Sequence, residues 1–438
     1  MVLSVVVISF LIITAIAFAP FYEFEGFGSD THGGYSGNTD PVIYKVVNLN
    51  SAGLGSLKYG LENINNPRII VFEISGTIEL NNYIYIENPY VTVAGQTAPS
   101  PGITLKGAGI IIGTHDVIIQ HLRIRVGDGA NGPGYDWRDA LDVEEYGATS
   151  YNVIVDHCSF SWATDEDCSI GWYPAHDVTF QWCIISECLY HSYHPDGRHS
   201  MGMLIGPSAQ KISIHHNLFA HNADRNPLVG GIKETEIINN VVYNWEWDGT
   251  KFDQYTGYPY QLGNIIGNYY KRGLDTISDY GGITLEYAEP PSLFYVHENI
   301  DTVYRTSNTQ DDWDLVEGGQ TMRSNSPTFT PSGIITQNPF DAYDSVLENA
   351  GARPNDRDTV DKRIINCVKH GTGHFIDSQE EVGGWPILNT NYRYLNIPSN
   401  PHNDDDNDGF TNLEEWLQDY SIDLLNKPFI NIIIERFH

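Results

Sequence analysis

The 438-residue sequence contains few basic residues. It has 24 Lys and Arg against 56 Asp and Glu, which gives a formal net charge of −32. A surface of this sign repels polyanions, so nucleic acid is a poor candidate partner. An anionic polysaccharide would meet the same repulsion unless divalent cations bridged it to the protein. As a global feature, the acidity is typical of a secreted or salt-exposed protein that stays soluble.

Cysteine and long apolar runs are also scarce. Five cysteines and no CxxC pair indicate neither a disulfide scaffold nor a zinc site, although an oxidising compartment would allow one or two bridges. Residues 2–19 form one apolar run that ends in small residues, which predicts that 1–19 is a signal peptide. No basic residue precedes this run, so an uncleaved membrane anchor remains the alternative. No later segment could span a bilayer.

The residues that are abundant predict an ordered β-rich chain. The sequence has 27 Tyr, 17 Phe, 9 Trp and 41 Gly, whereas charged residues are only 18%. Aromatic side chains supply core volume and glycines supply turns, so disorder is expected only near the ends. At this length the chain could form two or three domains, but repetitive β folds reach the same size as one.

A repeat runs through the middle of the chain. Seven segments resemble one another, among them "DVIIQHLRI", "NVIVDHCSF" and "KISIHHNLF". Their spacing varies from 23 to 36 residues, as expected for stacked coils with loops of different length. The equivalent first positions are Val117, Val153, Val178, Ile212, Thr235, Gly263 and Phe294.

Five residues after each start, the later repeats place asparagine in one column. Asn217, Asn240, Asn268 and Asn299 could form hydrogen bonds along the stack through their amides. Cys158 and Cys183 share the same column, so a disulfide or two stacked thiols are both possible. We therefore predict an all-β chain, a right-handed parallel β-helix from about residue 40 to about 310. A β-propeller is the alternative, but its repeats would be nearer forty residues.

An acidic loop near the end matches an EF-hand calcium loop. In "DDDNDGFTNLEE", residues 404–415, the ligand positions fall on Asp404, Asp406, Asp408, the carbonyl of Phe410, and Glu415. Gly409 occupies the sharp turn and a helix is expected to follow. A solvated acidic linker is the alternative. The expected organisation is a β-helix domain over 20–395, with its C-terminal extension, followed by a calcium loop and tail over 396–438.

A second acidic cluster interrupts a segment with the pattern of a buried strand. In "VDHCSFSWATDEDCSIG", residues 155–171, Asp165, Glu166 and Asp167 are consecutive. Three adjacent acids raise one another's cost of ionisation unless a cation, a positive side chain or solvent compensates them.

The combined motifs resemble the pectate lyases of the first polysaccharide lyase family. The resemblance covers roughly residues 23–300 and rests on "EGFGSDTHGGYSG", "VTVAGQTAPSPGITLKG", "NVIVDHCSFSWATDED", "HHNLFAHNADRNPLV" and "INNVVYNW". It implies a right-handed parallel β-helix and calcium-dependent β-elimination of polygalacturonate. It also implies that calcium compensates the acids at 165–167.

The resemblance assigns calcium to Asp139 and Asp165. The family's third ligand often lies four residues beyond Asp165, where this chain has Ser169. Glu166 or Asp142 could replace it, or the ion could arrive with the substrate.

The resemblance makes Arg225 the Brønsted base. Two further family cations are missing, because Gly230 stands where a second arginine is usual and Met201 stands where a lysine is usual. His199, just upstream of Met201, could take over a catalytic or substrate-binding role, and Glu166 could contact substrate as well as calcium.

The expected protein is thus a secreted, extracellular, monomeric lyase with calcium as cofactor and an anionic polysaccharide as partner. Two alternatives remain: a noncatalytic carbohydrate-binding β-helix, or a glycoside hydrolase on the same fold with paired carboxylates.

Overall fold

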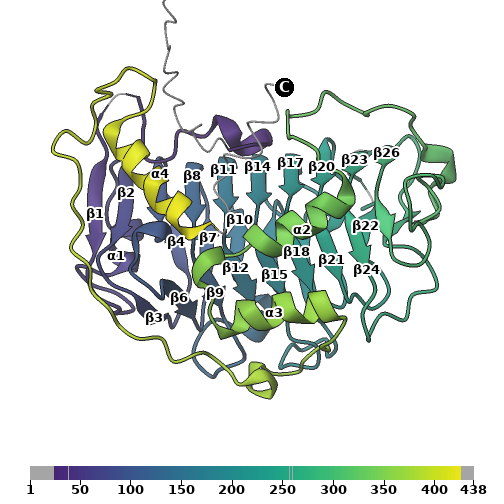
Figure 1. Cartoon of the computed structure of the whole chain (residues 1–438), viewed down its shortest axis with the longest axis horizontal. Coiled ribbons are helices and arrows are strands. Elements are labelled where there is room, and N and C mark those ends of the chain that lie inside the picture. Colours follow the sequence, from purple (N-terminus) through teal and green to yellow (C-terminus); the bar gives the residue numbers. More distant parts are fainter. Residues whose placement is uncertain (1–23, 38, 256, 259, 426–438) are drawn as a thin grey trace, which may run out of the picture.

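The computed structural model describes residues 24–37, 39–255, 257–258 and 260–425. Within them, strands stack side by side along the long axis of the molecule, and helices α2, α3 and α4 lie across the stack (Figure 1). Every pair of strands in the three sheets is parallel, and each complete coil from β2 onwards contributes one strand to each sheet. The chain is therefore a parallel β-helix, as predicted.

The first sheet has ten described strands and is called the ten-stranded sheet. Its order is β1 (Val42–Val46), β2 (Arg68–Phe72), β5 (Val91–Ala94), β8 (His115–Gln120), β11 (Ser150–Asp156), β14 (Ala175–Gln181), β17 (Ala209–His215), β20 (Thr235–Ile238), β23 (Leu262–Ile266) and β26 (Leu293–His297).

The second sheet is called the helix-covered sheet. Its order is β3 (Gly76–Glu79), β6 (Ile103–Lys106), β9 (Arg123–Arg125), β12 (Ser159–Ser161), β15 (Ile184–Ser186), β18 (Leu218–Ala220), β21 (Val241–Tyr243), β24 (Tyr269–Lys271) and β27 (Ile300–Asp301).

The third sheet carries the candidate site and is called the site sheet. Its order is β4 (Ile84–Ile86), β7 (Ile110–Ile112), β10 (Leu141–Val143), β13 (Glu166–Ile170), β16 (Met201–Ile205), β19 (Leu228–Gly230), β22 (Thr250–Asp253), β25 (Ile283–Tyr287) and β28 (Val316–Glu317).

The predicted register of the repeat is confirmed. Val153 pairs with Val117 on one side and with Val178 on the other, and the pairing continues through the remaining predicted starts to Phe294. Because side chains alternate across a strand, this register places the apolar residues of every coil in one continuous core.

The asparagine column also forms as predicted. Side-chain amides link Asn217 to Asn240 at 3.1 Å, Asn240 to Asn268 at 3.0 Å, and Asn268 to Asn299 at 2.8 Å. These bonds satisfy buried polar groups at a bend that recurs in every coil. Cys158 is a thiol and contributes no disulfide, and all five cysteines are free.

Four α-helices occur in the described residues: α1 (Leu57–Glu62), α2 (Pro339–Asn349), α3 (Thr359–His370) and α4 (Asn412–Leu424). Apolar residues of α2 and α3 pack on β15, β18 and β21 of the helix-covered sheet. Buried Arg125 of β9 anchors α3 through Asp358 and Asp361. None of the described helices has the length and apolar composition needed to cross a membrane.

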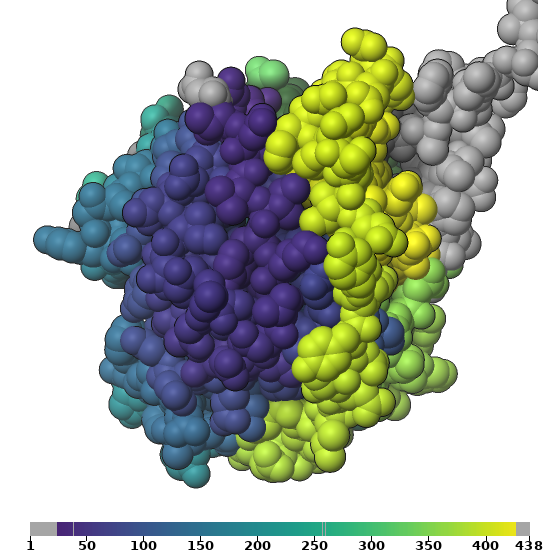
Figure 2. All heavy atoms as spheres, turned by 90° about the vertical axis from the view of Figure 1, so that its left-hand side faces the viewer, coloured from purple at the N-terminus to yellow at the C-terminus, as the bar shows by residue number. Residues whose placement is uncertain are grey.

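The C-terminal segment returns to the first coils. Leu413 and Leu417 of α4 pack against Ile69 and Val71 of β2, and Ile74 forms an antiparallel bridge with Tyr392. Figure 2 shows this yellow segment lying along the purple N-terminal coils. The acidic loop at 404–415 is thereby held at one end of the β-helix.

Candidate active site

Three carboxylates from adjacent coils meet at the N-terminal ends of two neighbouring strands of the site sheet, β10 and β13. Asp139 lies two residues before β10, and Asp165 and Glu166 lie at the start of β13. One carboxylate oxygen from each lies within 4.8 Å of the others. Asp139 accepts hydrogen bonds from the Glu166 backbone N–H at 2.9 Å and from the Ser169 hydroxyl at 2.8 Å. Ser169 therefore orients Asp139.

The electrostatics of this cluster favour a cation. Burial and the neighbouring charge of Asp165 raise the pKa of Asp139 to about 7. Asp142 pairs in register with Ser169, and burial together with Asp139 raises the pKa of Asp142 well above its ordinary value. Acids this close must share protons or gain a counter-charge. The carboxylate oxygens suit a hard divalent ion such as calcium.

Two histidines hold Asp165. The Nε2 of His199 lies 2.7 Å from Asp165 Oδ1, and the Nε2 of His194 lies 3.7 Å from the same oxygen. The two imidazoles stack with centroids 3.9 Å apart. The backbone N–H of Asp196 donates to His194 Nδ1 at 3.2 Å, so the neutral His194 ring carries its hydrogen on Nε2. In this tautomer His194 directs its N–H towards Asp165. The possible ligand atoms of Asp165, His194 and His199 lie within 4.8 Å of one another.

Arg225 lies beside the carboxylates on the loop before β19. Its backbone is left-handed, with φ of 60°, and its guanidinium forms an ion pair with the buried Glu166. Burial lowers the pKa of Arg225, whereas the charges of Asp165 and Asp139 oppose that shift. The structure thus brings Asp139, Asp165, Glu166, His199 and Arg225 together, as expected from the sequence.

Asp167 departs from the expectation that all three consecutive acids face one cation. It accepts a hydrogen bond from the Ala163 backbone N–H at 3.2 Å, and burial raises its pKa well above the ordinary value. Burial therefore favours the protonated form of Asp167, away from the three-carboxylate cluster. Asp156 is also remote from the cluster, because Gln120 and Gln181 donate to it at 2.9 and 3.0 Å on the ten-stranded sheet.

Sequence reasoning did not identify His194 or the acid Glu144. Three closely spaced histidines at 191, 194 and 199 were the available signal for His194. Glu144 accepts the backbone N–H groups of Trp172 and Tyr173, and burial raises its pKa to about 7. Nothing in the sequence pattern shows that this acid becomes partly buried beside the site sheet.

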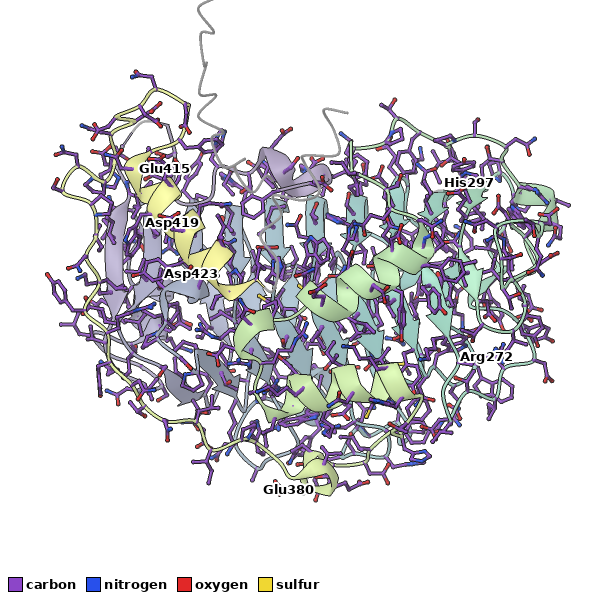
Figure 3. The ribbon with its side chains drawn as sticks, viewed as in Figure 1. Arg272, His297, Glu380, Glu415, Asp419 and Asp423 are labelled. Carbon is purple, nitrogen blue, oxygen red and sulfur yellow. The ribbon has the colours of Figure 1, made fainter. Side chains whose placement is uncertain are left out.

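The second acidic cluster is the loop before α4. Carboxylate oxygens of Asp404, Asp406 and Asp408 lie within 4.8 Å of one another. Asp404 accepts backbone N–H groups from Asn407 at 2.6 Å and from Asp408 at 3.2 Å. Figure 3 shows Glu415 at the loop end of α4. Burial and the charges of the three aspartates raise the pKa of Glu415. The three aspartates converge as the ligands of an EF-hand loop do.

Comparison with known proteins finds relatives that match most of the chain. The chain is 32% identical over 375 residues to a probable pectate lyase C of Aspergillus oryzae, covering 82% of this chain and 80% of the relative. It is 34% identical over 377 residues to a probable pectate lyase C of Neosartorya fischeri, covering 83% and 81%. No family model matches the chain.

Solved structures show the same fold at lower identity. A pectate lyase from Bacillus sp. N165, solved in complex with trigalacturonate, superposes with a TM-score of 0.50 at 19% identity, covering 75% of this chain and 98% of the other. The thermostable pectate lyase PL 47 gives a TM-score of 0.51 at 15% identity, covering 76% and 97%.

These relatives place the chain in the class of β-helical polysaccharide lyases. Within that class, the chain belongs to the pectate lyase family. It is an enzyme, a polysaccharide lyase.

Proposed function

We propose that this enzyme is a secreted lyase that cleaves polygalacturonate by calcium-assisted β-elimination. The observation that carries the proposal is the cluster of Asp139, Asp165 and Glu166 beside Arg225. The relatives named pectate lyase and the neighbour bound to trigalacturonate support the choice of substrate. The predicted signal peptide, which lies outside the described residues, supports secretion.

Asp139, Asp165 and Glu166 are the residues that would hold calcium, with Asp142 next to them. When bound, calcium would neutralise the uronate carboxylate and make its α-proton easier to remove. Ser169 keeps Asp139 oriented, His199 holds Asp165 at hydrogen-bond distance, and His194 stacks on His199. Such supporting contacts set the geometry of ligands.

Arg225 is the group proposed to act on the α-proton. A guanidinium stays protonated in water, so it must either lose its proton in the desolvated site or donate a hydrogen bond while hydroxide removes the proton. Its burial favours the neutral form. The ion pair with Glu166 favours the charged form and aims the guanidinium at the carboxylate cluster. His199 is proposed to contact the substrate carboxylate at the same place.

The test is to incubate the full-length protein with polygalacturonate and calcium and to follow ultraviolet absorbance. Elimination creates an unsaturated uronate that absorbs, whereas hydrolysis creates reducing ends without that absorbance. We expect absorbance that disappears in chelator. Reducing ends alone would identify a glycoside hydrolase, and binding without cleavage would identify a noncatalytic protein.

The loop at 404–415 is proposed to be a separate, structural calcium site, with the carbonyl of Phe410 as one ligand. Calcium bound only by the folded loop shifts the folding equilibrium towards the native state. Glu415→Gln should therefore lower the melting temperature in calcium by about 2 to 4 °C for each kcal/mol lost. The variant and the wild type should melt at closer temperatures in chelator. Differential scanning calorimetry measures both.

The matched control is Asp423→Asn, which also removes one acid from α4 but lies farther along the helix from the loop (Figure 3). It should melt as the wild type does in calcium and in chelator. A Glu415→Gln variant whose melting temperature responds to calcium as the wild type does would exclude Glu415 as a ligand.

A further inference from the structure

At one glycine of the site sheet, a neighbouring aromatic ring fills the space that a side chain would occupy. Gly230 ends β19, and a Cβ atom placed on it would lie 2.2 Å from Cε2 of Tyr255. The aromatic ring of Tyr255, which follows β22, therefore fills the space into which a side chain at 230 would project. Family resemblance would place an arginine at 230. In this chain an aromatic ring occupies the place of that cation.

A second aromatic residue joins this ring from another coil. Trp172 follows β13, and its ring meets that of Tyr255 edge-on, with centroids 6.4 Å apart and an interplanar angle of 90°. Trp172 is 51% exposed and Tyr255 is partly exposed. Two solvent-accessible rings from different coils thus form one aromatic corner on the site sheet. Such surfaces bind apolar faces, and their polar edges can still form hydrogen bonds.

The aromatic corner lies near Arg225, because Tyr255 packs over Gly230 at the end of β19 and Arg225 precedes the same three-residue strand. The Arg225 guanidinium is close enough to lower the pKa of Tyr255, although burial raises that pKa overall. Both cations near Tyr255 already have carboxylate partners: Arg225 pairs with Glu166, and Lys251 Nζ lies 3.1 Å from Asp248. Asp253, which pairs in register with Gly230, and the partly buried Asp224 add negative charge near the ring. A free substrate carboxylate at this corner would meet an aromatic surface and acids.

We propose that Tyr255 and Trp172 form a sugar subsite that selects an uncharged unit, such as a methyl-esterified uronate, beside the unit cleaved at Arg225. The apolar face of the sugar ring and the ester methyl pack on the two rings. A free uronate at this subsite would lose the hydration of its carboxylate and would be repelled by Asp253 and Asp224. An esterified unit carries no charge and avoids both costs. This inference rests on the proposed function and specifies its substrate: polygalacturonate that is partly esterified.

The test compares kcat/KM on partly methyl-esterified and on fully de-esterified polygalacturonate at saturating calcium. The wild type should favour the esterified polymer. Tyr255→Ala should reduce that preference by about tenfold, equivalent to 1.4 kcal/mol, and Tyr255→Phe should retain it because the ring remains. The double variant Tyr255→Ala with Gly230→Arg should prefer the de-esterified polymer, because the new arginine can pair with a free uronate carboxylate in the space that the ring vacates. Tyr392→Ala removes an exposed tyrosine from the C-terminal segment and should leave the preference unchanged.

A binding measurement separates this inference from the proposed function. Esterified and de-esterified oligogalacturonides are titrated calorimetrically into the wild type and into Trp172→Ala. Tighter binding of the esterified oligomer that Trp172→Ala abolishes supports the subsite, even if no elimination product forms and the lyase proposal fails. Equal or weaker binding of the esterified oligomer by the wild type overturns the subsite, whether or not the enzyme cleaves polygalacturonate.

Discussion

Arg225→Lys is expected to lose at least about a hundredfold in kcat, the low end for a positioned proton-transfer group. Lysine keeps the positive charge but cannot reproduce the planar, directional donors of a guanidinium. The guanidinium also pairs with buried Glu166. Its planar shape therefore orients both Arg225 and Glu166, and lysine lacks that shape. Substrate binding should suffer less, because the carboxylate cluster and the remaining cleft are intact. Kinetics on polygalacturonate at saturating calcium, with a melting curve, measure these effects.

The melting curve distinguishes a catalytic loss from a folding defect. The Arg225 side chain is about a quarter exposed and its charge is retained in the variant, so the melting temperature should change little. Arg323→Lys is the matched control, since Arg323 is an exposed arginine that also pairs with an acid, Asp311. It should keep full kcat. Near-normal turnover of Arg225→Lys would remove Arg225 from proton transfer and leave His199 as the next candidate.

Asp139→Asn is expected to have two opposite effects. Activity should fall by at least about a hundredfold. Replacing even a residue that only hydrogen-bonds to a metal ligand lowers metal affinity or activity by about 10- to 100-fold. In chelator at pH 8, however, the variant should be more stable than the wild type by at least about 1 kcal/mol. The reason is that the ionised Asp139 is buried beside Asp165, and asparagine removes that repulsion. Its one oxygen can still accept the Glu166 backbone N–H, and the Ser169 hydroxyl can accept from its NH2 group.

The direction in which stability changes with pH follows from the pKa of Asp139, which burial and Asp165 raise from 3.8 to about 7. Between these values the folded state keeps a proton that the unfolded state has lost. The calcium-free wild type should therefore lose stability as pH rises from 3.8 to about 7. Asp139→Asn should show a smaller loss over this range, and calcium should remove it in the wild type.

Urea unfolding across this pH range, with and without calcium, measures how the free energy of unfolding changes with pH. Asp136→Asn, an exposed acid three residues earlier, should follow the wild type. If Asp139→Asn destabilises the calcium-free protein at pH 8, the buried repulsion assigned to this cluster is wrong.

The repeat could be predicted in detail because a parallel β-helix makes its register visible in sequence. Pairing between coils is one residue to one residue, so the apolar alternation and the asparagine column recur wherever the chain completes a turn. Val117 to Phe294 were aligned from sequence, and the strands pair at those positions. Loops of different length did not disturb the register, because they lie between strands.

The site could be predicted only in part. Resemblance indicated Asp139, Asp165 and Arg225, since their motifs are local in sequence. It could not show that Asp167, one residue from Glu166, is buried against the Ala163 backbone. Adjacent residues in a strand point in opposite directions, so a run of acids does not remain one cluster once it folds. Nor could it show the second histidine on Asp165, because His194 reaches that carboxylate only through the fold of its loop.

By itself, then, the sequence determined the coil, its register and the polar column, all of which follow from local pattern and periodicity. The acids and the arginine of the site were indicated by the family resemblance of their motifs. The tertiary structure decided the partners of these groups. Glu166 meets Arg225, His194 joins His199 on Asp165, and Tyr255 fills the space above Gly230. These contacts join residues from different coils, and loop conformation sets them. A residue's charge and its specificity depend on those neighbours, which no single segment of the chain contains.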